Sequence, residues 1–324
     1  MSAVAVAGGL GDMGSRITGA LVERGKYEVY VMSRELPKTV VPSRSPPLTT
    51  VIETDYSSVD KLAKVLESYN IQTVICAFSL DFPAASDSQI NLIRASEMAS
   101  TVNRFIPSEF NVDYDLPDEV LPYPHKKFHT SARRELEKTN LEFSYIYAGM
   151  FMDYFAMPNL ETSLREVCFI VDPTNGVANV PGDGESRMAM SLAQDAARYT
   201  ALALELDAWP RVMTTAASCI SINQLITLFE ENLKHRLDIT YQPIQKLTKH
   251  ENKLLPRNIT IADSFPGGIE QVKALTADLE ASIALGSFQF DKLTDHLDLV
   301  MEFRGRTEPP MVIEQLLKMA WKGK

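Results

Sequence analysis

Three glycines that follow the first apolar run of this chain constrain its fold more than any other feature. The run 4–7 (Val-Ala-Val-Ala) leads into Gly8, Gly11 and Gly14, and a helical stretch follows at 15–24. In a strand–turn–helix unit the first glycine permits a tight turn, the second lets a pyrophosphate approach the backbone, and the third lets the helix pack against the strand. Free N–H groups at the start of the helix favour anions. The pattern predicts a dinucleotide site, although a glycine-rich turn opening another kind of α/β domain is the alternative.

The end of the second predicted strand indicates which dinucleotide is bound. This strand spans 28–32 and is followed by Ser33, Arg34 and, after a short interval, Lys38. A carboxylate at this position would bind the ribose 2′-hydroxyl of NAD, whereas a guanidinium suits the additional 2′-phosphate of NADP. The sequence therefore predicts NADP(H). The alternative is that Arg34 and Lys38 are solvated charges of a loop.

Strand-like and helix-like segments alternate through the first 150 residues. Because repeated βα units form parallel sheets, this alternation predicts an α/β fold, a Rossmann-type doubly wound parallel sheet whose ligands bind at the carboxyl ends of its strands. The predicted strands are 3–7, 28–32, 49–53, 73–77, 103–107 and 143–147, and the predicted helices are 13–24, 58–69, 86–101 and 126–139.

The alternation changes after about residue 155. We expect residues 1–155 to form the NADP-binding Rossmann domain and residues 156–324 to form a smaller α+β substrate-binding region interwoven with it. A proline-containing stretch at 113–124 predicts a loop over the site. Hairpin-type turns are expected at 175–176 and 181–184, helices at 189–206, 221–235, 268–284 and 312–321, and strands at 167–171 and 237–242.

Composition excludes several classes of function. The formal net charge is −10 and the pI is about 5.1, which argues against general nucleic-acid binding. Apolar runs stay too short for a membrane span, so we expect a cytoplasmic protein, monomeric or homodimeric. His125 and His129 share the i, i+4 spacing of a metal site, but a third ligand is not evident in the sequence, so we predict no metal.

A segment near the fifth predicted strand resembles a known family. Residues 102–110 (Val-Asn-Arg-Phe-Ile-Pro-Ser-Glu-Phe) are similar to the fifth-strand motif of the NmrA-like proteins, which include the isoflavone, pinoresinol–lariciresinol and phenylcoumaran benzylic ether reductases. The segments 147–151, 180–184 and 195–198 also resemble that family, and the proline-rich character resembles its fungal members. The resemblance implies an atypical short-chain dehydrogenase fold that binds NADP(H).

The glycine pattern and the resemblance together define a set of expected cofactor-binding residues. They are Gly8, Gly11, Asp12, Met13, Gly14, Arg34, Lys38, Phe78, Ser79, Pro107, Ser108 and Gly149.

The residue that would transfer a proton departs from the family pattern. The resemblance implies a lysine four residues before an Arg-Arg pair, but here that position before Arg133-Arg134 holds His129, with Lys126 and Lys127 one turn earlier. An unperturbed histidine has a pKa of about 6.5 and suits acid–base catalysis. Glu109, after the fifth strand, is a further candidate. The alternatives are a solvated lysine face and a structural carboxylate that accepts backbone N–H bonds.

Aromatic and thioether side chains predict a pocket for a flat apolar substrate. We expect an aromatic or heterocyclic small molecule there, and the rings could also stabilise a cation. Core packing is the alternative for these residues. A Tyr-x-x-x-Lys spacing also occurs at 123–127, but the flanking prolines place Tyr123 before the helix. The predicted substrate-binding residues are Phe110, Tyr123, Met150, Phe151 and Tyr154.

Three functions are compatible with these features. The first is an NADPH-dependent reductase of a small aromatic or polycyclic metabolite. The second is a redox-silent cyclase or isomerase, for example of Pictet–Spengler type, in which NADP(H) shapes the pocket. The third is a non-catalytic regulator that senses NAD(P).

Overall fold

A six-stranded parallel sheet forms the base of the molecule, in a computed structural model that describes residues 1–36 and 49–323. Its strand order is β3-β2-β1-β4-β5-β6 and every neighbouring pair is parallel, which is the doubly wound order. The predicted fold class is therefore confirmed. The strands are β1 (Ser2–Ala7), β2 (Tyr27–Ser33), β3 (Thr49–Glu53), β4 (Ile71–Cys76), β5 (Arg104–Ile106) and β6 (Glu142–Phe143).

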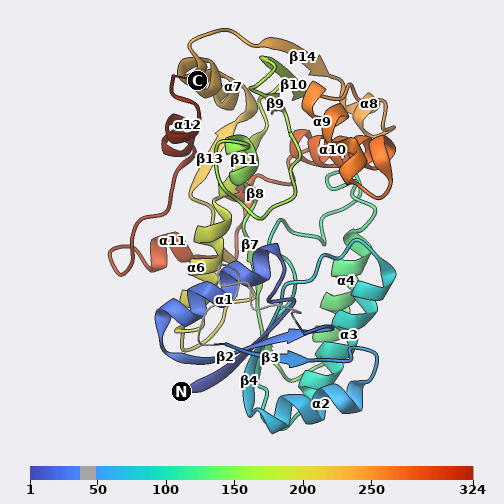
Figure 1. Cartoon of the computed structure of the whole chain (residues 1–324), viewed down its shortest axis with the longest axis vertical. Helices are drawn as coiled ribbons and strands as arrows, with labels where there is room; N and C mark the ends of the chain where they lie inside the picture. Colours follow the sequence, from blue (N-terminus) through green and yellow to red (C-terminus); the bar gives the residue numbers. More distant parts are fainter. Residues whose placement is uncertain (37–48, 324) are drawn as a thin grey trace.

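Helices cover both faces of this sheet (Figure 1). Helices α2 (Val59–Ser68), α3 (Pro83–Met98) and α4 (Lys126–Leu136) pack side by side on one face, and α1 (Asp12–Arg24) packs with α6 (Ala193–Ala203) on the other. Alternate residues of β1 enter different cores, because side chains along a strand point to opposite faces. Val4 and Val6 pack with Ile17 of α1, whereas Ala5 belongs to the core that contains Leu92 of α3.

The predicted strand at 143–147 is divided between two sheets. β6 stays beside β5, but β7 (Tyr145–Tyr147) pairs with β12 (Val212–Thr214), which pairs in turn with β15 (Leu297–Asp298). Ser144 marks the change of partner, since its N–H donates to Phe105 while the N–H of Tyr145 donates to Arg211. Segments from late in the chain thus return to the first half, and the boundary predicted at residue 155 remains a prediction.

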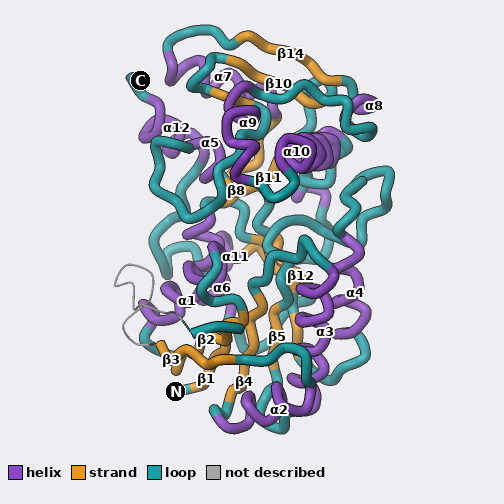
Figure 2. Tube along the Cα trace, turned by 45° about the vertical axis from the view of Figure 1, so that its right-hand side comes forward, coloured by secondary structure: helices purple, strands orange, loops and turns teal. Residues whose placement is uncertain are grey.

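The remaining elements form the upper part of the molecule in Figure 1, and Figure 2 shows the same arrangement from another direction. One sheet contains β8 (Met150–Phe151), β11 (Arg187–Ser191) and β13 (Ser218–Ser221), and another contains β9 (Val171–Asp172), β10 (Val177–Pro181) and β14 (Asp238–Gln242). The helices here are α5 (Asp153–Ala156), α7 (Ile222–Leu233), α8 (Ile244–Leu247), α9 (Pro256–Ile261), α10 (Gly268–Ala284) and α12 (Ile313–Trp321), whereas α11 (Leu299–Glu302) lies lower and packs beside α6.

Three predicted elements of this second half were wrong in type or extent. The helix expected at 189–206 begins at Ala193, because residues 187–191 form β11, and a short buried apolar run has no periodicity that separates strand from helix. The turn at 181–184 does not close a hairpin, since β10 and β11 lie in different sheets. The strand expected at 167–171 is reduced to β9, whereas the turn at 175–176 does join two antiparallel strands.

The segment 195–198, which resembles the family, anchors the end of the chain. Asp195 accepts a hydrogen bond of 2.7 Å from the N–H of Met311, and Arg198 donates to Thr307 at 2.8 Å and to the carbonyl of Glu308 at 2.6 Å. These hydrogen bonds attach residues 307–311, which precede α12, to helix α6.

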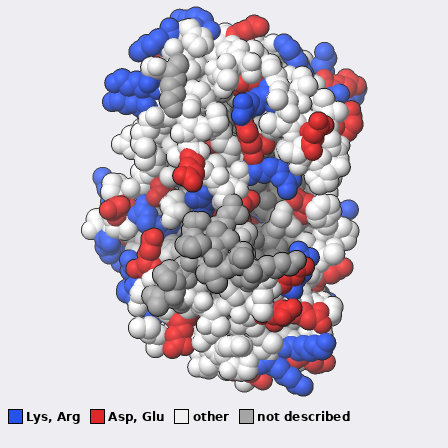
Figure 3. Space-filling view, viewed as in Figure 1, with Lys and Arg blue, Asp and Glu red and all other residues white. Residues whose placement is uncertain are grey.

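The described helices and the visible surface add two facts. None of the helices within 1–36 and 49–323 combines the length and apolar character needed to cross a bilayer. On the face shown in Figure 3, acidic and basic side chains are interspersed.

Candidate functional site

The glycine loop has the geometry that its spacing predicts. Gly8 adopts a positive φ of 79°, and a Cβ added at Gly14 would lie 2.1 Å from the carbonyl oxygen of Gly8. Gly11 is the N-cap of α1, and its surroundings are open apart from that same carbonyl at 3.2 Å. Gly9 was not predicted, yet a Cβ there would meet Val31 at 2.9 Å. The loop is therefore tightly packed at Gly8, Gly9 and Gly14 and open at Gly11, where a ligand's phosphates could approach the backbone.

A cleft of about 560 Å³ lies beside this loop. It extends past the ends of β2 and β4 to the start of α3, and five predicted cofactor residues line it: Gly8, Gly11, Arg34, Phe78 and Ser79. No side chain caps α1 among the described residues, so N–H groups of its first turn, which contains Asp12 and Met13, remain available to an anion. Lys38 lies outside the described residues.

Three other predicted cofactor residues lie deeper than the cleft. Pro107 and Ser108 are buried after β5, where the hydroxyl of Ser108 donates to the carbonyl of Phe78 at 2.7 Å. This hydrogen bond joins the ends of β4 and β5. Gly149 has a positive φ of 70° and lies so close to β11 that a Cβ would be 2.2 Å from the carbonyl oxygen of Ala189. Gly149 lines a second cavity instead of the cleft.

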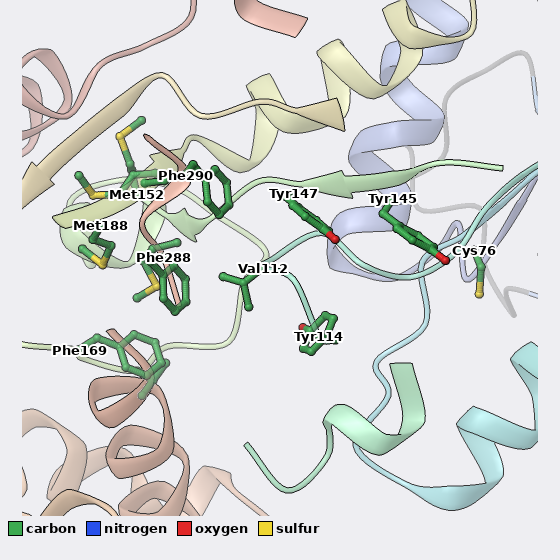
Figure 4. Packing of buried hydrophobic residues seen from close by; sticks show 14 of the residues in the cluster. Cys76, Val112, Tyr114, Tyr145, Tyr147, Met152, Phe169, Met188, Phe288 and Phe290 are labelled. Atoms are coloured by element: carbon green, nitrogen blue, oxygen red, sulfur yellow. The ribbon is translucent and has the colours of Figure 1, made fainter. Parts of the chain in front are cut away.

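The second cavity, which we call the aromatic cavity, has a volume of about 210 Å³. All five predicted substrate-binding residues line it, and Tyr154 meets Phe169 edge to face at 5.1 Å. Figure 4 shows four further lining residues from three segments: Val112 and Tyr114 of the loop after β5, Phe169, and Phe288. The lining residues are Phe110, Asn111, Val112, Tyr114, Leu121, Tyr123, Gly149, Met150, Phe151, Tyr154, Phe169, Leu275, Asp278, Leu279, Ser282 and Phe288.

The linings of the aromatic cavity and the nucleotide cleft come in part from segments that follow the neighbouring strands β4 and β5. Burial raises the pKa of Tyr154, and the carboxylates of Asp153 and Asp12 raise it further, so the start of α1 is within electrostatic range of this phenol. Phe110, which lines the cavity, follows two residues after Ser108, which is bonded to Phe78 of the cleft. Both cavities are therefore lined by segments that follow the carboxyl ends of parallel strands.

Glu109 is held by a buried ion pair. Arg133 Nε lies 2.8 Å and 3.0 Å from the two carboxylate oxygens, and its Nη2 donates to the same group and to the Tyr147 hydroxyl. Burial raises the pKa of Glu109, and the guanidinium opposes that shift. Arg133 also pairs with Asp113 and thereby fastens the loop after β5 to helix α4.

His129 is buried and neutral. Its Nδ1 lies 3.0 Å from the carbonyl oxygen of Ser108, so this nitrogen carries the proton and donates it. The ring stacks on Tyr114, with 3.6 Å between ring centroids. Burial lowers the pKa of His129 to about 3, so the imidazole stays uncharged at neutral pH.

The two lysines have different surroundings. Lys126 Nζ donates to the carbonyl of Leu116 at 2.8 Å and pairs with Asp118 at 2.5 Å, which ties the loop to the start of α4. Lys127 is exposed, and its ammonium lies 5.2 Å from the ring centroid of Phe128. Tyr123 precedes α4, as the flanking prolines indicate, and faces the aromatic cavity.

The structure does not bring the predicted proton-transfer groups to the cavity wall. Glu109, Lys126, Lys127 and His129 are absent from its lining as far as the chain is described, and their catalytic roles stay predictions. The later half of the chain supplies lining residues that we did not predict, including Asp278 and Phe288, because helix α10 shows only an amphipathic pattern in the sequence. Within the described residues, no group of three or more His, Cys, Asp or Glu side chains could hold a metal ion.

The strand order, the glycine loop and the adjoining cleft define a Rossmann-type dinucleotide-binding protein. Residues 1–282 match the NmrA-like family, and the chain belongs to that family. The predicted family assignment is confirmed.

Relatives in sequence are named as oxidoreductases. The oxidoreductase swnN of Metarhizium robertsii is 29% identical, over 81% of this chain and 82% of that protein. The oxidoreductase BOA1 of Botryotinia fuckeliana is 33% identical, over 64% and 68% respectively. The phenylcoumaran benzylic ether reductase PT1 of Pinus taeda is 29% identical, over 64% and 67%.

Solved structures share the fold. A structure from a study of pinoresinol–lariciresinol and phenylcoumaran benzylic ether reductases superimposes with a TM-score of 0.75 at 19% identity, covering 98% of this chain and 99% of the other. The binary complex of leucoanthocyanidin reductase with NADPH from Vitis vinifera gives a TM-score of 0.71 at 16% identity and covers 98% of both chains.

Proposed function

We propose that this protein is an NADPH-dependent reductase of a small ring-containing molecule. The observation that carries the proposal is that segments after the neighbouring strands β4 and β5 line two cavities: a cleft beside a glycine loop, and a cavity lined by aromatic side chains. The sequence relatives named as reductases and oxidoreductases, together with the NADPH complex of a protein with the same fold, support the same assignment.

The residues of the cleft fit an NADP molecule. Gly14 and Gly8 leave no space for a side chain between strand and helix, and the uncapped start of α1 offers N–H groups to the pyrophosphate. Arg34 is exposed just after β2 and lines the cleft, and its guanidinium would bind the 2′-phosphate. When bound, the cofactor supplies a hydride.

The residues around the aromatic cavity would position the substrate and exclude water. Phe110, Phe151 and Tyr154 provide ring faces for a flat molecule. The loop between β5 and α4 contributes Tyr114 and Leu121 to the wall, and both side chains are buried. An aromatic or heterocyclic substrate is therefore the class we propose.

The direct test is oxidation of NADPH coupled to product formation. Purified protein, NADPH and a panel of bicyclic ketones, enones and iminium salts are monitored at 340 nm, and products are identified by mass spectrometry. We expect one equivalent of NADPH to be oxidised per product. Product that forms at an equal rate with NADP⁺ or NADPH, without a change in absorbance, would identify the redox-silent alternative. Tight NADPH binding without any product would favour the regulatory alternative.

A further inference from the structure

One side chain in the wall of the aromatic cavity carries a full charge. Within the described residues the lining contains the carboxyl group of Asp278 and no Lys or Arg. Asp278 comes from α10, and 13% of its side chain is exposed. The other lining groups are aromatic or aliphatic, with the Asn111 amide and a few hydroxyl groups as neutral polar members.

The described groups that favour the charged form of Asp278 are two imidazoles, those of His250 and His125. Its Oδ1 accepts a hydrogen bond of 2.7 Å from Nε2 of His250. Burial raises the pKa of Asp278, although the hydrogen bond from His250 lowers it. A carboxylate in an apolar wall costs free energy unless a cation pairs with it. The ring faces of Tyr123, Tyr154 and Phe169 would add cation–π attraction for the same ligand.

Apart from Asp278 itself, the cavity has few groups that could donate a proton. Reduction of a ketone adds a hydride to carbon and a proton to oxygen, so it needs a proton donor. The four predicted donors do not line the cavity. His129 is neutral, and its Nδ1–H donates a hydrogen bond to the carbonyl of Ser108. Burial raises the pKa of the phenols of Tyr114, Tyr123 and Tyr154, and the guanidinium groups of Arg133 and Arg165 oppose that shift only partly for Tyr114 and Tyr154. These phenols are therefore weaker acids than free tyrosine.

We propose that the substrate is a ring-containing iminium cation and that Asp278 is its counter-ion. This inference rests on the proposed NADPH-dependent reduction. The hydride from C4 of NADPH forms a new C–H bond at the iminium carbon, and the π pair of the C=N bond moves onto nitrogen. The products are a neutral amine and NADP⁺. Charge and electrons balance without a proton, so the step leaves Asp278 as a carboxylate that can pair with the cation.

The test separates recognition of the cation from the reaction. NADPH-loaded protein is titrated calorimetrically with N,N-dimethyl-1,2,3,4-tetrahydroisoquinolinium, a cation that cannot accept a hydride, and with 1-tetralone, a neutral ring analogue. N-methyl-3,4-dihydroisoquinolinium and 1-tetralone are then compared as substrates by NADPH oxidation. We expect the unreactive cation to bind at least about tenfold more tightly than 1-tetralone, a preference within the range of a buried charge pair with cation–π contacts.

Variants of Asp278 and of its hydrogen-bond partner His250 test whether the charge of Asp278 is what binds the cation. Asp278→Asn keeps the shape but removes the charge, and should lower cation affinity and kcat/KM for the iminium at least about tenfold while NADPH and 1-tetralone affinities stay unchanged. Asp278→Glu should restore part of the cation affinity. His250→Gln, the matched control, keeps a hydrogen-bond donor beside Asp278 and should retain the preference for the cation.

Failure of this inference is distinguishable from failure of the proposed function. The inference is overturned if Asp278→Asn binds the cation as tightly as the wild type, or if the wild type shows no cation binding at millimolar concentration. Reduction of 1-tetralone by the wild type with the same efficiency as N-methyl-3,4-dihydroisoquinolinium would overturn it too, and would leave the reductase assignment intact. Absence of NADPH binding by the wild type would overturn both.

Discussion

At the scale of single residues, Gly14 gives the sharpest test of the glycine loop. A Cβ at this position would lie 2.1 Å from the carbonyl oxygen of Gly8, so Gly14→Ala must displace α1 from β1. We expect the free energy of unfolding to fall by about 1–3 kcal/mol, as in overpacked cores, and NADPH binding to weaken. Denaturant titration measures the first effect and calorimetry the second.

Gly19 on the same helix is the matched control, because a Cβ there meets no atom within 4 Å. Gly19→Ala should keep or raise stability, since alanine is favoured over glycine in a helix by up to about 1 kcal/mol. Equal effects of the two substitutions would show that Gly14 does not set the packing of α1 on β1.

The buried imidazole of His129 gives a pH-dependent prediction. Burial lowers its pKa from 6.5 to about 3, so below pH 6.5 the unfolded chain binds a proton that the folded chain does not. Its contribution to stability should therefore decrease as the pH falls from about 6.5 to about 3, by roughly 1.4 kcal/mol per pH unit.

His129→Asn keeps a donor for the Ser108 carbonyl but does not titrate. Denaturant unfolding at several pH values should show that stability falls less steeply with decreasing pH in this variant than in the wild type. Parallel curves between pH 6 and pH 4 would contradict a buried neutral histidine.

At the scale of elements, the start of α4 holds the loop that covers the aromatic cavity. Lys126 joins α4 to the carbonyl of Leu116, and Tyr114 and Leu121 of the same loop line the cavity. Lys126→Met should increase hydrogen exchange across residues 114–121 and raise KM more than it lowers kcat, because the loop loses its anchor while the cleft is unchanged.

Lys127→Met provides the comparison, since the Lys127 side chain is exposed one residue away. It should leave exchange in the loop as in the wild type. If Lys126→Met instead abolishes kcat and flattens its pH profile while exchange is unchanged, Lys126 is a proton donor and does not act as an anchor.

The elements that the sequence predicted well are those whose pattern is local. The first five strands of the sheet are apolar runs bounded by turn residues, and α10 begins and ends at the residues expected for it. Residues 143–147 were divided because Ser144 changes partner to Arg211, which lies 67 residues further along the chain. The pairing partner of a strand is a long-range property that the strand itself does not encode.

At the scale of the whole molecule, the two cavities are assembled from segments far apart in the chain. The cleft could be predicted from the sequence because its glycine loop and Arg34 follow successive strands. The lining of the aromatic cavity could be predicted only in part. Phe110 and Met150 belong to the first half of the chain, whereas Phe169, Asp278 and Phe288 come from the second half. Helix periodicity placed Asp278 on α10 but gave no indication of the cavity that it faces.

Calorimetric titration of NADPH and NADH into nucleotide-free protein tests the central claim most directly. We predict one NADPH site per chain, with an affinity at least about tenfold higher than for NADH, because we expect Arg34, which lines the cleft, to form a charge-assisted contact with the 2′-phosphate. Arg34→Ala should remove that preference and leave NADH binding unchanged. No binding of either nucleotide would contradict the account, and equal affinity for both in the wild type would refute the role of Arg34.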